Sequence, residues 1–291
     1  MSTSADIAIP EPVNVQGVPS SFEEPSFSSH PSGNLGIALL TWVASFLLLL
    51  LPNFLAIPYL LLRYKGLQPT AEVLFADKNF ILLMVAGVLP AHVITLIIVW
   101  LVATRFGERS VVEGLKLKWD AKFSLAASVG LAIILYVAAL LLTLAFGGQG
   151  TALDKLVESS RAAALTIAFL AVATAPIVEE SVYRGILYPA IERAANAKVA
   201  VVVVTLLFAI PHVPQYWPNL AVIGSITLLS VALTILRAKT GRLLPCIAVH
   251  FVFNGIQSVL IVIDPYLRAA LENVQHARGT GAVIRLLTHF H

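Results

Sequence analysis

Seven mostly apolar stretches alternate with short polar segments along this chain. Several are long enough to cross a hydrocarbon core of about 30 Å as α-helices. The predicted helices cover residues 35–60, 79–104, 123–146, 162–194, 198–213, 219–236 and 243–263, and the fourth turns polar after residue 178. The pattern predicts an all-α fold, a polytopic transmembrane helical bundle of about seven to eight spans.

The two ends of the chain lack this pattern. Residues 1–33 hold eight Ser, five Pro and no Lys or Arg, so they cannot bury enough apolar surface to offset the entropy lost on ordering. We predict a disordered N-terminal tail without a signal peptide, because a basic n-region is missing. In the C-terminal tail, residues 266–291, apolar residues at 282–287 surround Arg285. An interfacial helix fits this tail better than an eighth span does.

Composition points to a membrane protein. Hydrophobic residues make up 58% of the 291 residues and charged residues 12%, whereas soluble domains carry about 25% charged residues. The mean hydropathy is +0.87. We therefore expect an integral, multi-pass protein of the lipid bilayer, in the plasma membrane if bacterial and in the endoplasmic reticulum if eukaryotic.

Charge and cysteine content narrow the function classes. The net charge is +3, and its Lys and Arg residues gather in short loops, so nothing points to nucleic acid. The loops around residues 105–122, 193–198 and 237–242 are the more basic ones, which favours a cytoplasmic position for them and for the N-terminus. The single cysteine, Cys246, excludes an intramolecular disulfide and a CxxC motif.

Three of the apolar segments carry polar residues that membrane spans normally avoid. These are Glu179, Glu180 and Arg184 in the fourth segment, His212 behind Phe208 in the fifth, and His250 and Asn254 in the seventh. Insertion scales assign a central Asp, Lys or Arg a cost of roughly 2.5 to 3.5 kcal/mol. Ionisable groups at this depth therefore usually mark a functional site.

Spacing predicts how these residues are presented. Glu180 and Arg184 are four residues apart, so they share a helix face and can pair, whereas Glu179 points about 100° away. Pro176 removes a backbone donor just before them, so we expect a kink or break there, with carbonyl groups exposed near the polar residues. Pro211 restricts the residue before it and is expected to end the fifth helix early.

The polar groups are predicted to lie at overlapping depths. A turn near residues 195–196 makes the fourth and fifth helices antiparallel and puts Glu179 level with His212, roughly 21 Å from the adjoining basic residues. His250 and Asn254 share one face of the last span and lie roughly 12 and 18 Å from the basic residue before it. Three segments thus contribute to one site inside the bilayer.

These side chains suit the hydrolysis of an amide. A carboxylate with a neighbouring histidine can take a proton from water, and a second histidine with an asparagine can donate hydrogen bonds to a developing oxyanion. The chain contains no GxSxG, HExxH or Walker glycine motif, so the sequence offers no signature of those other mechanisms.

The three polar motifs resemble those of a known family. They read EExxxR at 179–184, FxxxH at 208–212 and HxxxN at 250–254, which is similar to the CAAX-protease and bacteriocin-processing (CPBP) intramembrane peptidases, a family that includes the type II CAAX prenyl endopeptidases. The resemblance covers about residues 160 to 265. It implies four parts: the tail 1–33, N-terminal transmembrane helices 34–160, a catalytic CPBP-like transmembrane core 161–265, and the C-terminal tail 266–291.

The resemblance also implies a role for each motif residue. Glu179 and His212 would activate water, His250 and Asn254 would stabilise the oxyanion, and Glu180, Arg184 and Phe208 would support them. The implied activity is that of a glutamic-type intramembrane endopeptidase without a cofactor. Its substrate would be a membrane-associated or prenylated (CAAX-type) protein or peptide, as in CAAX-box protein processing.

Several alternatives stay open. Two histidines and a carboxylate could instead hold a catalytic zinc ion, which would leave Asn254 without a role. Glu180 with Arg184 alone fits a structural ion pair, and the HxxxN motif alone fits interhelical hydrogen bonding. His92 in the second span is interpreted as packing, because it has no partner at helical spacing.

Two other protein classes fit the same residues. An ion- or proton-coupled transporter would use them as a relay, but residues 35–146 show no mirrored broken helix of the kind that such transporters contain. A catalytically inactive immunity or binding scaffold would tolerate substitutions at every motif residue.

Overall fold

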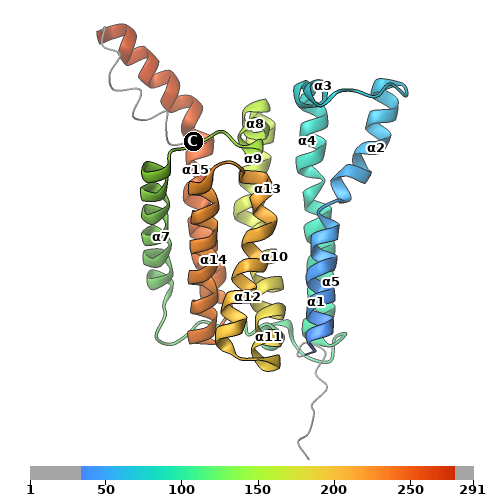
Figure 1. Cartoon of the computed structure of the whole chain (residues 1–291), viewed down its shortest axis with the longest axis vertical. Helices are drawn as coiled ribbons and strands as arrows, with labels where there is room; N and C mark the ends of the chain where they lie inside the picture. Colours follow the sequence, from blue (N-terminus) through green and yellow to red (C-terminus); the bar gives the residue numbers. More distant parts are fainter. Residues whose placement is uncertain (1–33, 279–291) are drawn as a thin grey trace, which may run out of the picture.

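The computed structural model describes residues 34–278, with side chains described for residues 34–272. Every regular element in this part of the chain is a helix (Figure 1). The elements are α1 (Leu35–Leu48), α2 (Leu51–Tyr64), α3 (Ala71–Ala76), α4 (Lys78–Ala86), α5 (Val88–Thr104), α6 (Val111–Gly114), α7 (Leu125–Phe146), α8 (Ala152–Ser159), α9 (Arg161–Phe169), η2 (Leu170–Thr174), α10 (Ala175–Glu180), η3 (Ser181–Leu187), α11 (Tyr188–Ala194), α12 (Ala197–Ala209), η4 (Ile210–His212), α13 (Val213–Tyr216), α14 (Leu220–Thr240) and α15 (Leu244–Arg278). The all-α prediction is confirmed.

Seven helical units in the described residues are long and apolar enough to cross a membrane. They are Leu35–Tyr64, Lys78–Thr104, Leu125–Phe146, Arg161–Ala194, Ala197–Tyr216, Leu220–Thr240 and Leu244–Glu272. Each corresponds to a predicted span, and the protein is an integral, multi-pass membrane protein. The tail 1–33 and the apolar residues at 282–287 lie outside the described residues.

The last helix is longer than predicted. The apolar pattern ends it at residue 263, but α15 continues through Pro265 to Arg278. Hydropathy detects the part of a helix that contacts lipid, and the polar residues beyond it extend the helix without extending the apolar stretch. The first part of the C-terminal tail is therefore a continuation of the last span.

Polar side chains cap several helices. Those of Asn196 and Asn219 accept a backbone N–H in the first turns of α12 and α14, and Gly241 ends α14 in the left-handed conformation, with φ of 64°. Asn196 lies in the predicted turn between α11 and α12, so this turn is confirmed. It makes the two helices antiparallel, as the depth argument requires.

Asp77 joins the second helix to the fourth. Its carboxylate accepts the Asn79 and Phe80 backbone N–H groups at the start of α4, and also the hydroxyls of Tyr59 and Tyr64 from α2. Burial alone would raise the pKa of the Asp77 carboxyl, but these hydrogen bonds outweigh it and hold the pKa below its usual value. The carboxylate thus stays ionised while it fixes this corner of the bundle.

Three apolar clusters hold the spans together. The first joins α1 and α5 to η3, α11 and α12, with Ala103, Ile186 and Val204 among its buried residues. The second joins α7, α14 and α15, and the third joins α4 to α9 and η2. The fourth span, Arg161–Ala194, contributes to the first and third clusters and lies between the other helices (Figure 1).

The fourth span passes Pro176 without a break. The π-helical turn η2 precedes the proline, and in it the Ala175 N–H donates to the Leu170 carbonyl oxygen. The wider turn accommodates a proline that has no N–H to offer, so the expected kink or break is replaced by local widening. A second π-helical segment, η3, follows the two glutamates, and no sequence pattern predicts it.

Candidate active site

Glu180 lies at the centre of the buried polar cluster. Its Oε1 accepts hydrogen bonds from Arg184 Nη1 at 3.0 Å and from His250 Nδ1 at 2.9 Å, and both Glu180 and Arg184 side chains are 0% exposed. The predicted ion pair is confirmed. A buried ion pair is tolerated only where further hydrogen bonds offset the lost hydration, and Arg184 has them.

The remaining donors of Arg184 reach helix α14. Its Nε donates to Thr234 Oγ1 at 3.2 Å, and its Nη2 donates to the backbone oxygen and the hydroxyl of Ser230 at 3.0 and 2.8 Å. The guanidinium also lies over the Phe208 ring, 4.7 Å from its centroid. Arg184 thus fixes the fourth span to α12 and α14, and through Glu180 it fixes His250 on α15.

Glu179 is the more open of the two carboxylates. Its side chain is 25% exposed, and its Oε2 lies 3.8 Å from His250 Nε2, a distance too long for a hydrogen bond. The two glutamates therefore differ as the spacing predicts: one is held inside the cluster, and the other faces accessible space. The Glu179 carboxylate is therefore accessible to a water molecule.

His212 has a defined tautomer. Its Nδ1 lies 2.7 Å from the Phe208 carbonyl oxygen, which can only accept, so Nδ1 carries the proton and Nε2 of the neutral ring is an acceptor. The ring stacks on Phe208 at 5.0 Å. His212 ends the 3-10 turn η4. Helix α12 ends at Ala209, but Ile210 keeps helical backbone angles and the helical unit continues to Tyr216, so Pro211 tightens the helix locally instead of ending it.

Phe208 connects the two histidines. Its ring contacts His212 face to face and His250 edge on, with centroids 5.0 and 6.1 Å apart. In the described residues no hydrogen bond or ion pair joins Glu179 to His212 directly. Arg184, His212 and His250 thus all contact the Phe208 ring, while the two groups that the resemblance assigns to water activation share no hydrogen bond or ion pair in this part of the chain.

His250 and Asn254 lie on one face of α15, as predicted. Asn254 Nδ2 donates to the Ala171 carbonyl oxygen at 2.9 Å. In a π-helical turn the residue at position 176 would satisfy this oxygen, but that residue is proline, and the Ala175 N–H is already bonded to Leu170. Asn254 supplies the missing donor and keeps a second N–H. The predicted exposed carbonyl is confirmed.

The interpretation of His92 as a packing residue without a partner is wrong, because His92 has a hydrogen-bond partner. Its Nδ1 lies 2.8 Å from Thr174 Oγ1 at the end of η2, and Glu179 lies near enough to act on it electrostatically. The partner is 82 positions away in sequence, so helical spacing could not have found it. A buried histidine in an otherwise apolar span was the available signal.

The donor set bears on the zinc alternative. No three or more His, Cys, Asp or Glu side chains in the described residues are grouped so that they could hold a metal ion. His250 Nδ1 is bonded to Glu180, and the lone cysteine, Cys246, is buried against α14. No step of the chemistry below uses a metal, and the chelator experiment below tests the zinc alternative.

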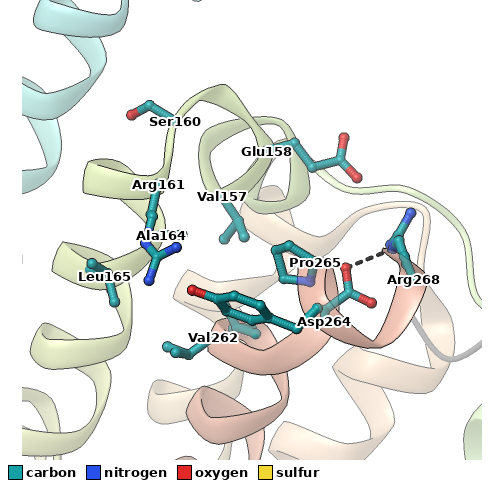
Figure 2. Close-up of a pocket in the computed structure, with 12 residues that line it drawn as sticks. Val157, Glu158, Ser160, Arg161, Ala164, Leu165, Val262, Asp264, Pro265 and Arg268 are labelled. Atoms are coloured by element: carbon teal, nitrogen blue, oxygen red, sulfur yellow. Dashed lines mark ion pairs between the residues drawn. The ribbon is translucent and has the colours of Figure 1, made fainter. Parts of the chain in front are cut away.

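A cavity of about 380 Å³ lies away from the motif residues (Figure 2). It lies between α8, α9 and α15, with Arg161, Asp264 and Arg268 among its lining residues and an Asp264–Arg268 ion pair at its edge. Arg161 is 18 residues from Glu179 on the fourth span, which corresponds to roughly 27 Å. This cavity is therefore separate from the polar cluster.

Comparison with known proteins identifies the segment that carries the site. Residues 161–256 match the family model described as type II CAAX prenyl endopeptidase Rce1-like. The match includes all three motifs and leaves the spans before residue 161 uncovered. No curated protein and no solved structure matches the chain. Residues 161–256 thus form an Rce1-like domain, and the resemblance to the CPBP peptidases that the motifs indicate is confirmed for this segment.

Proposed function

We propose that the protein is an intramembrane endopeptidase of the glutamic type. The observation that carries the proposal is the contrast between two adjacent carboxylates: Glu180 is enclosed by Arg184 and His250, whereas Glu179 is open to accessible space and 3.8 Å from His250 Nε2. Burying one charge with its partners leaves the other available for acid–base chemistry inside the bilayer.

The reaction uses one water molecule. Glu179 takes a proton from the water while His212 Nε2 accepts its second hydrogen in a hydrogen bond, and the water oxygen forms a bond to the carbonyl carbon of the peptide. The carbonyl π electrons move onto its oxygen, which becomes the oxyanion. When the intermediate collapses, the carbon–nitrogen bond breaks, and the proton held by Glu179 passes to the leaving amine.

His250 and Asn254 stabilise the oxyanion in this mechanism. Because His250 Nδ1 donates to Glu180, Nε2 can donate to an oxyanion only when the ring carries both protons. Asn254 uses one N–H for Ala171 and offers the other to the oxyanion.

The substrate that we propose is a membrane-associated or prenylated (CAAX-type) protein or peptide. Support comes from the description of the matched family and from a site that lies within the spans of the bundle. A farnesylated peptide with a C-terminal CAAX sequence and the same peptide without the lipid distinguish the two substrate classes.

The test is cleavage of quenched-fluorescence peptides by the detergent-purified protein. We expect Glu179→Ala and His212→Ala to abolish cleavage, and Glu158→Ala, which removes an exposed carboxylate on α8, to leave it unchanged. Activity that survives a zinc chelator supports the glutamic type, whereas loss with the chelator would favour a zinc enzyme. Equal cleavage by the wild type and Glu179→Ala would mean that a contaminating peptidase cleaves the substrate, and would reject the proposal in favour of the transporter or the inactive scaffold.

A further inference from the structure

His92 lies outside the matched domain but contacts its central helix. It is 8% exposed on α5, and its Nδ1 is 2.8 Å from Thr174 Oγ1. The single proton of the Thr174 hydroxyl is donated to the Leu170 carbonyl oxygen at 3.0 Å, so the hydroxyl accepts from His92 Nδ1–H. The contact has a direction: His92 donates to Thr174, and Thr174 donates to Leu170.

This chain of hydrogen bonds ends on the π-helical turn. Leu170 O also accepts the Ala175 N–H, and the neighbouring Ala171 O accepts Asn254 Nδ2. A side chain therefore donates to each of these two carbonyl oxygens. Leu170 O accepts from Thr174, which is itself bonded to His92 of α5, and Ala171 O accepts from Asn254 of α15. The turn is fixed between two helices that are distant in sequence.

The turn decides where the glutamates point. A π-helical turn holds one residue more than an α-helical turn, so its loss would rotate everything after it by about 100°. Glu179 follows the turn by five residues, and a rotation of this size would move its carboxylate away from His250 Nε2. Whatever stabilises the turn therefore orients Glu179.

We propose that His92 is a positioning residue of the active site: through Thr174 it maintains the π-helical turn that directs Glu179 toward His250 and the substrate. Helix α5 thereby completes a site whose motif residues all lie in the matched domain. The effect on catalysis rests on the proposed function, whereas the orientation of position 179 does not.

Kinetics test the catalytic part. His92→Leu and Thr174→Val are each expected to lower kcat by about 10- to 100-fold, the range for a displaced catalytic group, with KM nearly unchanged, and the double variant is expected to lose no more than either single one. His92→Asn keeps a donor at the place of Nδ1 and is expected to restore most of the activity. The matched control is Thr95→Val, because Thr95 is buried on the same helix and, within residues 34–272, its hydroxyl bonds only to Ala91 O of that helix.

Additive losses in the double variant, or full activity of His92→Leu, would reject the catalytic part. Thermal unfolding in detergent shows whether a variant loses activity because it misfolds or because Glu179 is displaced. Only variants that unfold in the wild-type temperature range are compared. Thr174→Val exchanges a hydroxyl for a methyl group and keeps the shape of the side chain, so it remains informative if His92→Leu fails to fold.

Cysteine labelling tests the orientation without any activity. Cys246 is the single cysteine and is fully buried, so Glu179→Cys introduces a reporter whose reaction with a small maleimide depends on its access to water. We expect His92→Leu to slow this labelling by about tenfold and His92→Asn to leave it unchanged. Equal labelling in all three backgrounds would overturn the inference. Glu179-independent cleavage with slowed labelling would instead reject the proposed function and retain the role of His92.

Discussion

Two adjacent glutamates, Glu179 and Glu180, have different surroundings in the structure. Glu180 and Glu179 are neighbours in the chain, yet one has a side chain that is 0% exposed and the other 25%. Helical spacing alone predicts that Glu180 pairs with Arg184 and that Glu179 points elsewhere. It could not predict Ser230 and Thr234 as partners of Arg184, because that depends on how α14 packs against the fourth span.

This separation predicts opposite effects of two substitutions. Arg184→Met leaves Glu180 buried without its charged partner and is expected to destabilise the protein by about 3 to 5 kcal/mol, whereas Glu179→Gln is expected to abolish cleavage and to change stability by less than about 0.5 kcal/mol. Thermal unfolding in detergent measures both. Adding Glu180→Gln to Arg184→Met removes the unpaired charge and should recover part of the loss. A Glu179→Gln variant as unstable as Arg184→Met would contradict the division of roles.

At the scale of elements, the fourth span is organised by a proline. The sequence predicts a disturbance at Pro176 and an exposed carbonyl beside the polar residues, and both are present, as the turn η2 and Ala171 O. The form of the disturbance is not predictable from proline chemistry, since a kink, a break and a π-helical turn all remove the same N–H from the ladder. Packing against α5 and α15 selects among them.

Asn254 also has a structural role, because it donates to Ala171 O, which Pro176 leaves without a backbone N–H. A double substitution at positions 176 and 254 tests this role. Asn254→Leu leaves the part-buried Ala171 O without its side-chain donor, and an unsatisfied group costs up to about 1 to 3 kcal/mol when it is buried. In the Pro176→Ala background residue 176 regains an N–H, so we expect the same Asn254→Leu change to cost clearly less there. Chemical or thermal unfolding of the four proteins gives the coupling.

Cleavage by the same four proteins separates structure from catalysis. If Asn254 also stabilises the oxyanion, Pro176→Ala restores stability to Asn254→Leu without restoring activity. Recovery of both would show that Asn254 acts on the backbone alone. Equal stability losses in the two backgrounds would contradict the assignment of Ala171 O as a carbonyl that the proline leaves unsatisfied.

For the whole molecule, the number and order of the spans follow from hydropathy, but the contacts between the two halves do not. The matched domain begins at residue 161, and its motifs suggest a self-contained core. The first apolar cluster nevertheless joins α1 and α5 to η3, α11 and α12, and His92 reaches Thr174 across the same boundary. Such contacts between distant segments leave no periodic signal in the sequence, so the N-terminal helices look like an unrelated addition until the fold is known.

These contacts predict that neither half suffices alone. The exposed segment 147–150 between α7 and α8 is a suitable place to divide the chain, so residues 1–147 and 148–291 can be expressed as separate pieces. We expect the two pieces to assemble in the membrane, to purify together and to retain Glu179-dependent cleavage, because packing between spans does not require a continuous chain.

The second piece alone is expected to aggregate or to be inactive, since the first apolar cluster loses α1 and α5 and the π-helical turn loses its contact with His92. Size-exclusion chromatography and peptide cleavage are the measurements, and a monodisperse, fully active piece 148–291 would show that the Rce1-like domain forms its site without the N-terminal spans. A piece that is monodisperse but inactive, and that regains activity when residues 1–147 are supplied, would place the contribution of those spans in the site itself.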